Sequence, residues 1–251
     1  DINFIDAPTK IDGKYNYSHN VTVDNCTFSS AEYNEEIVGI KLNTTYNAVV
    51  SNCTATNIHS LAQFQSVDNA TVIENVKVEN CKNGISLGNM ASATISNAEI
   101  TAMGYGVRLD GAKEREVAVT IEGATIEAFI PVNVRKMNDD ACKATVRFEG
   151  DNNLDGDTYE IAFCSNEYEN GVEPFAPKGT FTLDGAEKFR AYFGPVTSVS
   201  AFDAAINSKG DVVVQEKIES VGTGFEVERD VIIDFDNQEL NAGSTATSTW
   251  Y

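Results

Sequence analysis

Apolar and polar residues follow one pattern that recurs along the first half of the chain, each time around an Asn or a Gly. The recurring runs are VDNCTF at Asn25, VSNCTA at Asn52, IENVKV at Asn75, ISNAEI at Asn97, IEGATI at Gly123 and FEGDNN at Gly150. These markers are 27, 23, 22, 26 and 27 residues apart. A period of roughly 20 to 50 residues indicates a repeat array, in which each unit buries its apolar face against its neighbours.

Each turn of this array is predicted to hold two short strands. Around the marker, apolar residues occupy every second position, which is the period of a strand. The second strand is predicted at the runs GIKLN, AQFQS, GISLG, GVRLD and VNVRK, which begin at Gly39, Ala62, Gly84, Gly106 and Val132. Bends that carry Asn or Gly would join these strands into a coil of parallel strands.

The leucine-rich repeat has a similar length and also carries an Asn, but it needs Leu at most core positions. Here Val, Ile, Ala and Phe fill those positions. From Val21 to Val134 the runs resemble the right-handed parallel β-helix of the pectin-lyase-like superfamily, and more loosely the β-helix modules of secreted bacterial surface proteins. The resemblance implies an all-β solenoid, and it says little about activity because such scaffolds host unrelated functions.

The coil is expected to occupy residues 1–142 and to end or be capped near Gly150. There the two apolar sites after the marker become Asp151 and Asn153. A small β segment is predicted over residues 143–196, in the runs YEIAFCSNEY, GTFTLDG and KFRAYFGP.

Residues 197–251 are predicted to form a module of one helix and several strands. In SVSAFDAAINSKG, Ser200 and Asp203 form the pattern of a capping box, and Gly210 is placed to end the helix. A helix followed by strands resembles the N-terminal cap and first rung of a further β-helix. The module therefore either begins a next unit of a tandem protein or caps a coil, its own or that of a neighbouring copy in head-to-tail contact.

The formal net charge of −20 and the pI near 4.3 limit the classes of partner. Such a field repels phosphate backbones and anionic lipids, so we expect no nucleic-acid partner, and a membrane surface is a poor partner. It also disfavours polyanions such as pectate unless calcium bridges the charges. No apolar run is long enough to span a membrane. Because Asp1 leads directly into INFID without a leader, we expect a mature or excised piece of a secreted or cell-surface protein.

The five cysteines are widely spaced and include no C-x-x-C pair, which argues against a zinc site. Cys26 and Cys53 fall on the same inward position of successive rungs, where other rungs carry Val76, Ala98 and Ala124. Buried thiols are the favoured interpretation, and a disulfide between these two cysteines is the alternative.

The outward positions of the second strand are the candidate ligand-binding face. In enzymes of the resembled superfamily, an exposed sheet and its adjoining loops hold the substrate. Two columns of polar residues are predicted there, and the candidate binding residues are Lys41, Asn43, Gln63, Gln65, Arg108, Asp110, Asn133 and Arg135. Such a face could contact a glycan or another surface ligand without catalysis.

Catalysis has weak support on this face, with Asp110 and Arg108 as the candidates. Glycoside hydrolysis needs two carboxylates, and the two columns contain one. NGISLG at Asn83 and GVRLDG at Gly106 are similar to segments of polygalacturonases, but Asn83 replaces the family's His and Asp110 its Lys.

The stretch DNNLDGDTYE is a candidate calcium loop. Asp151, Asn153, Asp155 and Asp157 match oxygen-ligand positions of an EF-hand loop, but Ala162 stands where that loop needs a Glu. An acidic turn is the alternative.

The sequence as a whole predicts a noncatalytic β-helix module for adhesion, spacing or glycan contact, without an obligatory cofactor. The alternative is a polysaccharide lyase or glycoside hydrolase of the pectin-lyase-like superfamily.

Overall fold

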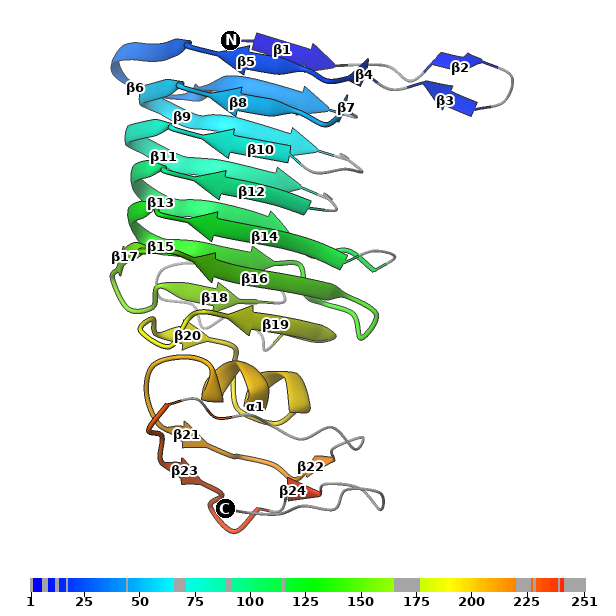
Figure 1. The fold of residues 1–251 in the computed structure, drawn as a ribbon, viewed down its shortest axis with the longest axis vertical. Helices are drawn as coiled ribbons and strands as arrows, with labels where there is room; N and C mark the ends of the chain where they lie inside the picture. Colours follow the sequence, from blue (N-terminus) through cyan, green and yellow to red (C-terminus); the bar gives the residue numbers. More distant parts are fainter. Residues whose placement is uncertain are drawn as a thin grey trace.

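The structure is a computed structural model, and it describes residues 2–5, 9–11, 14–16, 18–43, 45–65, 71–88, 92–113, 116–164, 177–219, 227, 229–238 and 240–241. Parallel strands stack along one axis into a coil of about six turns, with one short helix after it (Figure 1). The predicted all-β parallel β-helix is therefore confirmed.

Two sheets form the walls of the coil. The nine-stranded sheet contains β1 (Ile2–Ile5), β6 (Thr27–Asn43), β9 (Thr54–Gln65), β11 (Lys77–Gly88), β13 (Glu99–Asp110), β15 (Thr125–Arg135), β18 (Ile161–Phe163) and β20 (Ala191–Tyr192), with β17 (Asn153–Gly156) also paired to β15. The seven-stranded sheet contains β5 (Thr22–Asp24), β8 (Val49–Ser51), β10 (Thr71–Glu74), β12 (Ser92–Ser96), β14 (Glu116–Glu122), β16 (Lys143–Glu149) and β19 (Thr180–Asp184).

Short strand pairs complete the description. They are β2 (Thr9–Ile11) with β3 (Lys14–Asn16), β4 (Ser18–His19) with β7 (Thr45–Tyr46), β21 (Val212–Val213) with β23 (Ile233–Asp234), and β22 (Ile218–Glu219) with β24 (Leu240–Asn241). The β2–β3 pair is antiparallel and the other three are parallel.

The marker residues turn the chain from the seven-stranded sheet into the nine-stranded one. All six have a positive φ, from 50° at Asn97 to 68° at Gly150. This left-handed conformation is open to Gly and is adopted by Asn more readily than by other residues. The amide of Asn97 also donates to Asn75 Oδ1 at 3.4 Å, so the marker side chains connect successive turns.

The strand after each marker does not stop before the second predicted strand. β11 runs without interruption from Lys77 to Gly88, and its pairing with β13 shifts register near Cys81. A second set of positive-φ residues, Asn57 and Asn80, lies at this bend, where Asn80 Nδ2 donates to Asn57 Oδ1 at 2.6 Å. The second predicted strand of each turn is therefore not a separate strand. It is the later part of one long bent strand that begins just after the marker.

The inner face of the coil is a continuous column of aliphatic side chains. Val50, Ile73, Ile95 and Ile121 occupy paired positions in neighbouring strands, and all four are fully buried. Burying one such side chain is worth about 1.5–3 kcal/mol, so the stacking of rungs supplies the stability that no rung has alone.

The coil continues through the segment 143–196. β16 pairs with β14 and β19, and β18 pairs with β15 and β20, so both walls extend past the boundary expected at residue 142. After Gly150 one extra residue enters the rung. Asn152 is buried, and its side-chain amide accepts a hydrogen bond from Ala124 N and donates to Ile121 O and Glu149 O. Leu154 takes the inner apolar position.

Helix α1 (Val199–Ile206) lies beyond the last rung (Figure 1). Its N-cap is Ser198, whose Oγ accepts from Ala201 N at 3.2 Å, so the capping box predicted at Ser200 and Asp203 is wrong. Ala201 and Ala204 join the coil core, whereas Phe202 packs in a second cluster with residues of 196–218.

Beyond α1, the pairs β21–β23 and β22–β24 are parallel, joining Val212 to Ile233 and Ile218 to Leu240. This spacing is close to that of the coil rungs, and α1 itself packs on β19 at the end of the coil. That residues 197–251 cap a coil or begin a next unit stays a prediction. In the described part of the chain, no helix has the length and apolar character needed to cross a membrane.

Candidate functional site

The C-terminal ends of β6, β9, β11, β13 and β15 form a groove on the outer face of the nine-stranded sheet, with a volume of about 340 Å³. We call it the strand-end groove. Its floor is the chain around Leu42, Phe64 and Leu87, whose side chains point into the core. Both predicted polar columns line it, because paired strands place Lys41, Gln63, Ser86 and Arg108 side by side.

Basic and amide side chains dominate the groove. Its basic residues are Lys41, Arg108, Arg135 and Lys136, and its amides are Asn43, Gln63 and Gln65. Among the described residues that line it, Asp110 is the one carboxylate. The groove is thus a cationic region on a chain whose net charge is −20.

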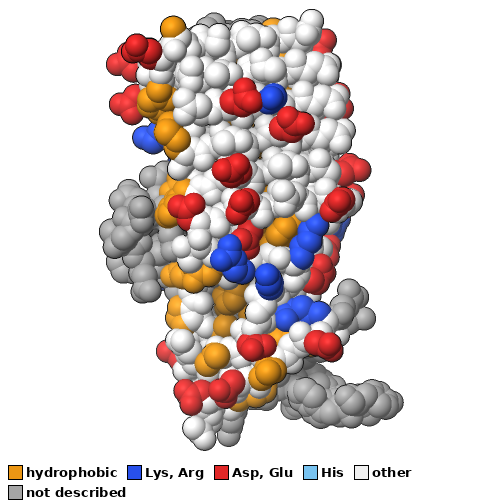
Figure 2. All heavy atoms as spheres, turned by 90° about the vertical axis from the view of Figure 1, so that its left-hand side faces the viewer, with side chains coloured by type: hydrophobic (Ala, Val, Ile, Leu, Met, Phe, Trp, Pro, Cys, Tyr) orange, Lys and Arg blue, Asp and Glu red, His pale blue; other side chains and the backbone are white. Residues whose placement is uncertain are grey.

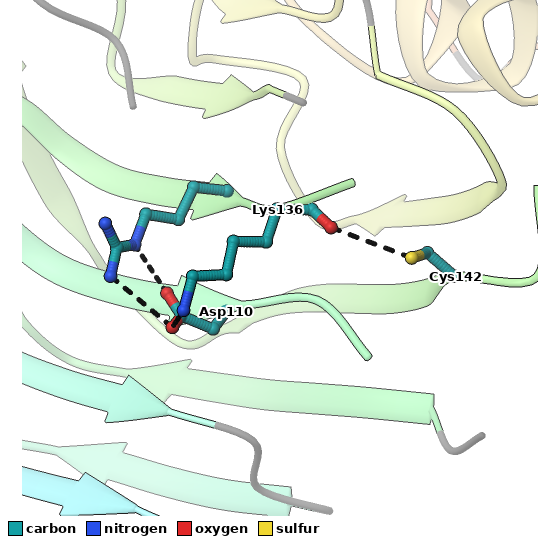
Figure 3. Close-up of polar contacts among 4 residues, drawn as sticks. Asp110, Lys136 and Cys142 are labelled. Carbon is teal, nitrogen blue, oxygen red and sulfur yellow. Dashed lines mark hydrogen bonds and ion pairs between the residues drawn. The ribbon is translucent and has the colours of Figure 1, made fainter. Parts of the chain in front are cut away.

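Asp110 is held by two cations at one end of the groove (Figure 3). Arg135 Nε donates to Asp110 Oδ1 at 2.5 Å and Arg135 also reaches Oδ2 at 3.4 Å, while Lys136 Nζ pairs with Oδ2. The Asp110 side chain is 14% exposed. Both carboxylate oxygens are therefore engaged. Because two cations face one carboxylate, this end of the groove keeps a net positive charge.

Lys136 was not among the predicted residues. It follows β15 with a φ of 61°, and this turn directs its amine back toward Asp110. Lys136 is the last residue of the run VNVRK. Strand alternation places Asn133 and Arg135 on the outer face and leaves Lys136 off it. Only the unusual backbone conformation brings it into the groove.

The middle of the groove is hollowed at Ser86 and Gly88. A Cβ at Gly88 would lie 3.2 Å from Phe64 O and 3.9 Å from Asp110 Oδ2, so a larger side chain would fill the space between β9 and β13. Ser86 is 5% exposed, and its buried Oγ has no hydrogen-bond partner in the protein. A buried polar atom without a partner is costly, so this position is less stable than the paired backbone around it.

Asn133 lies outside the groove, contrary to the prediction. It continues the column after Arg108, but it is fully buried and neither atom of its amide has a partner. Its neighbour on the next strand is Ala162, which packs with Ile130 and Cys164 in a separate apolar cluster. The outer face of the sheet is thus apolar around Ala162, and the groove ends there.

The groove contains no pair of carboxylates suited to glycoside hydrolysis. Asp110 is the only acid among its described lining residues, and both of its oxygens are engaged. Hydrolysis of this kind needs an acid and a second carboxylate, and the described lining of the groove supplies one carboxylate.

Two of the four candidate calcium residues lie on a strand, and Asp151 and Asp157 lie on either side of it. Asn153 and Asp155 are exposed on β17, whereas Asp151 pairs with Lys188 at 3.2 Å. A strand advances about 3.3 Å per residue, so alternate side chains project in parallel and do not surround one cation. Among the described residues, no three His, Cys, Asp or Glu side chains form a group able to hold a metal ion. Calcium binding stays a prediction without a coordinating loop.

A second polar hollow lies beside β17, next to the chain that leads into β20. Figure 2 shows one side of the coil, on which acidic side chains are scattered and Lys and Arg gather below the middle. The central charges of the hollow already neutralise each other. Glu160 is 7% exposed and accepts from Arg190 N at 2.6 Å and from the Arg190 guanidinium. This hydrogen bonding raises the pKa of Arg190. The ion pair has a structural role, because it fastens the chain before β20 to the preceding rung.

Comparison with known proteins gives one match. No curated protein and no solved structure matches significantly. Residues 3–126, just under half of the chain, match the sequence model of a family described as "Periplasmic copper-binding protein (NosD)". The matched residues form the first turns of the coil and include all of the strand-end groove except Arg135 and Lys136. This part of the chain is therefore similar to the NosD family, whose match accords with the parallel β-helix.

Proposed function

We propose that the protein is a noncatalytic β-helix module that binds a short acidic glycan in the strand-end groove. The observation that carries the proposal is the grouping of Lys41, Arg108, Arg135 and Lys136 around the strand-end groove. Cations attract carboxylate or sulfate groups, and the amides of Gln63 and Gln65 offer donors and acceptors to sugar hydroxyls.

The charge of the whole chain limits the length of the ligand. A net charge of −20 repels a long polyanion from most of the surface, while the groove attracts it only locally. An oligosaccharide that carries one or a few acidic groups gains the local attraction and avoids most of the repulsion. Short acidic glycans are therefore expected to bind more tightly, per acidic group, than acidic polymers.

The description of the matched family supports an extracytoplasmic location, and we infer that this module works in the periplasm or at the cell surface. Copper is less well supported. The described part of residues 3–126 holds Cys26, Cys53, Cys81 and His59, but these do not form a group of three or more metal ligands with any Asp or Glu. The described residues do not fit a copper centre, and no role is assigned to copper.

The proposal is tested by calorimetric titration of the full chain with a uronate-containing oligosaccharide and with the matching neutral oligosaccharide. Lys41 is exposed on the groove, so Lys41→Gln removes one charge without cutting into the core. Loss of one exposed charge contact of about 1 kcal/mol should weaken binding roughly 5-fold. Binding should also weaken as salt is raised.

Lys143→Gln is the matched control. Lys143 is exposed on β16 of the seven-stranded sheet and its loss changes the net charge equally. Equal affinity for the neutral and acidic oligosaccharides, or equal weakening by both substitutions, would overturn the proposal.

The alternative is a polysaccharide lyase or glycoside hydrolase that uses Asp110 and Arg108. A depolymerisation screen over neutral and acidic polysaccharides separates the two functions. Turnover that disappears in Asp110→Asn would establish the enzyme and exclude a purely binding role.

A further inference from the structure

Cys26 and Cys53 occupy equivalent places in the first two complete rungs. Each follows a positive-φ Asn, and each is flanked by residues that pair across the strands, Asp24 with Ser51 and Thr27 with Thr54. Thr54 N also donates to Cys26 O at 2.9 Å. Paired strands are about 4.8 Å apart, a separation within the Cα range that a disulfide spans.

The two thiols make equivalent contacts on successive rungs, and the Cys26 side chain interacts with that of Cys53. Cys26 Sγ donates to Asp24 O at 3.4 Å, and Cys53 Sγ donates to Ser51 O at 3.1 Å, which is the same contact one rung later. Cys53 Sγ also lies 3.6 Å from Val23 O, on the rung that carries Cys26. The Cys53 sulfur therefore points toward the rung that carries Cys26.

Access differs between the two sulfurs. Cys26 is partly exposed and Cys53 is fully buried. Burial raises the pKa of the Cys53 thiol, and the neighbouring Cys26 contributes to the shift. A thiol of raised pKa is the weaker nucleophile toward an external reagent, so the first reaction falls to Cys26.

We propose that Cys26 and Cys53 form a cross-rung disulfide by exchange with an external disulfide, and that this bond fastens the first complete rung to the second. Both are free thiols in the structure. In the first step the Cys26 thiolate attacks one sulfur of the external disulfide, whose S–S bond breaks and releases one thiolate. In the second step the Cys53 proton passes to the thiolate released in the first step, and the Cys53 sulfur attacks the Cys26 sulfur and releases the second thiolate. The two cysteines are oxidised and one external disulfide is reduced to two thiols.

The position of the pair gives the bond a mechanical effect. A stacked array unravels from its ends, where a rung has one neighbour. The rung of Cys26 is less completely covered than those after it, since Val23 is 6% exposed and Phe28 is partly exposed, whereas Val50 and Ala55 are almost fully buried. A bond at this point joins the weaker rung to a fully buried one.

The test uses the full folded chain, oxidised glutathione as the external disulfide, alkylation of remaining thiols and trypsin digestion without reduction. The expected product is a linked pair of peptides, 15–41 with Cys26 and 42–77 with Cys53. The linked pair should be lost in Cys26→Ala and Cys53→Ala. Ala fits this position, because Ala98 and Ala124 occupy it in later rungs and are buried there.

Cys81→Ala is the control, since Cys81 is buried two rungs from Cys26 and its thiol contacts Glu79 O on its own strand. It should keep the linked pair, and its melting temperature should rise on oxidation as in the wild type. Glutathione bound to Cys26 beside an alkylated Cys53 would overturn the proposal. So would recovery of both cysteines unlinked after oxidation of the folded chain.

Discussion

At the scale of single residues, the bends of the coil depend on side chains that tolerate a positive φ. The first set of bends was predictable because the same position of each repeat holds either Asn or Gly, as at Asn75 and Gly123. The second set at Asn57 and Asn80 was not separable from ordinary polar positions, and Lys136 shows that a residue with no such preference can be held in the same conformation by its surroundings.

Substitution of Asn75 tests this role. Asn75→Ala should lower the free energy of unfolding by about 1–2 kcal/mol, because Ala has no favourable contact to offset the left-handed conformation. Asn75→Gly should cost less, since Gly123 and Gly150 serve the same turn. Urea unfolding of the three proteins measures the order, and equal losses in both variants would contradict it.

Residue chemistry also predicts a pH effect at His59. Burial, and then the charges of Lys82 and Arg108, hold its pKa below the usual 6.5, and its Nε2 lies 3.4 Å from Asn83 Nδ2. As pH falls through 6.5 the unfolded chain takes up this proton and the folded chain does not, so stability falls with pH until the folded pKa is passed.

The free energy of unfolding, measured at about pH 7.5 and about pH 5.5, should decrease for the wild type and decrease less for His59→Gln. The comparison isolates His59 from every other titrating group. An identical decrease in both proteins would show that His59 contributes nothing.

At the scale of elements, apolar alternation located nearly every strand of the first rungs, because inward positions must be apolar in any stacked coil. It failed at Gly150, where one extra residue changes which side chains point inward. In the sequence the apolar alternation is lost there. In the folded chain Asn152 is buried with its hydrogen bonds satisfied, and the inward apolar positions resume at Leu154.

Helix α1 is the element that links the coil to the strands after it, and Arg229 holds its C-terminal end. The Arg229 guanidinium donates to Ala205 O at 3.1 Å, to Ile206 O at 3.0 Å and to Gly210 O at 2.6 Å. A cation at this end also interacts favourably with the helix dipole.

Arg229→Gln should therefore loosen α1 and β21 while leaving the coil intact. Hydrogen exchange should become faster in peptides from 199–213 and stay unchanged in 71–88. Lys209→Gln, at an exposed neighbouring position, is the control. Faster exchange along the whole coil would mean that α1 is essential to the fold rather than a local cap.

At the scale of the whole molecule, the described part of a strongly acidic chain carries the cationic strand-end groove. The columns that line it follow from strand pairing and were predictable, including Lys41, Gln63 and Arg108. The burial of Asn133 was not, because it depends on the apolar cluster of later strands. The net charge alone argues against any anionic ligand, and only the three-dimensional grouping of cations reverses that conclusion locally.

The most direct measurement is hydrogen exchange of the full chain with and without a uronate-containing oligosaccharide, with the length of the recovered sugar determined in the same sample. We expect slower exchange at the ends of β6, β9, β11 and β13 and a sugar of unchanged length. Protection confined to the seven-stranded sheet, or a shortened sugar, would contradict it.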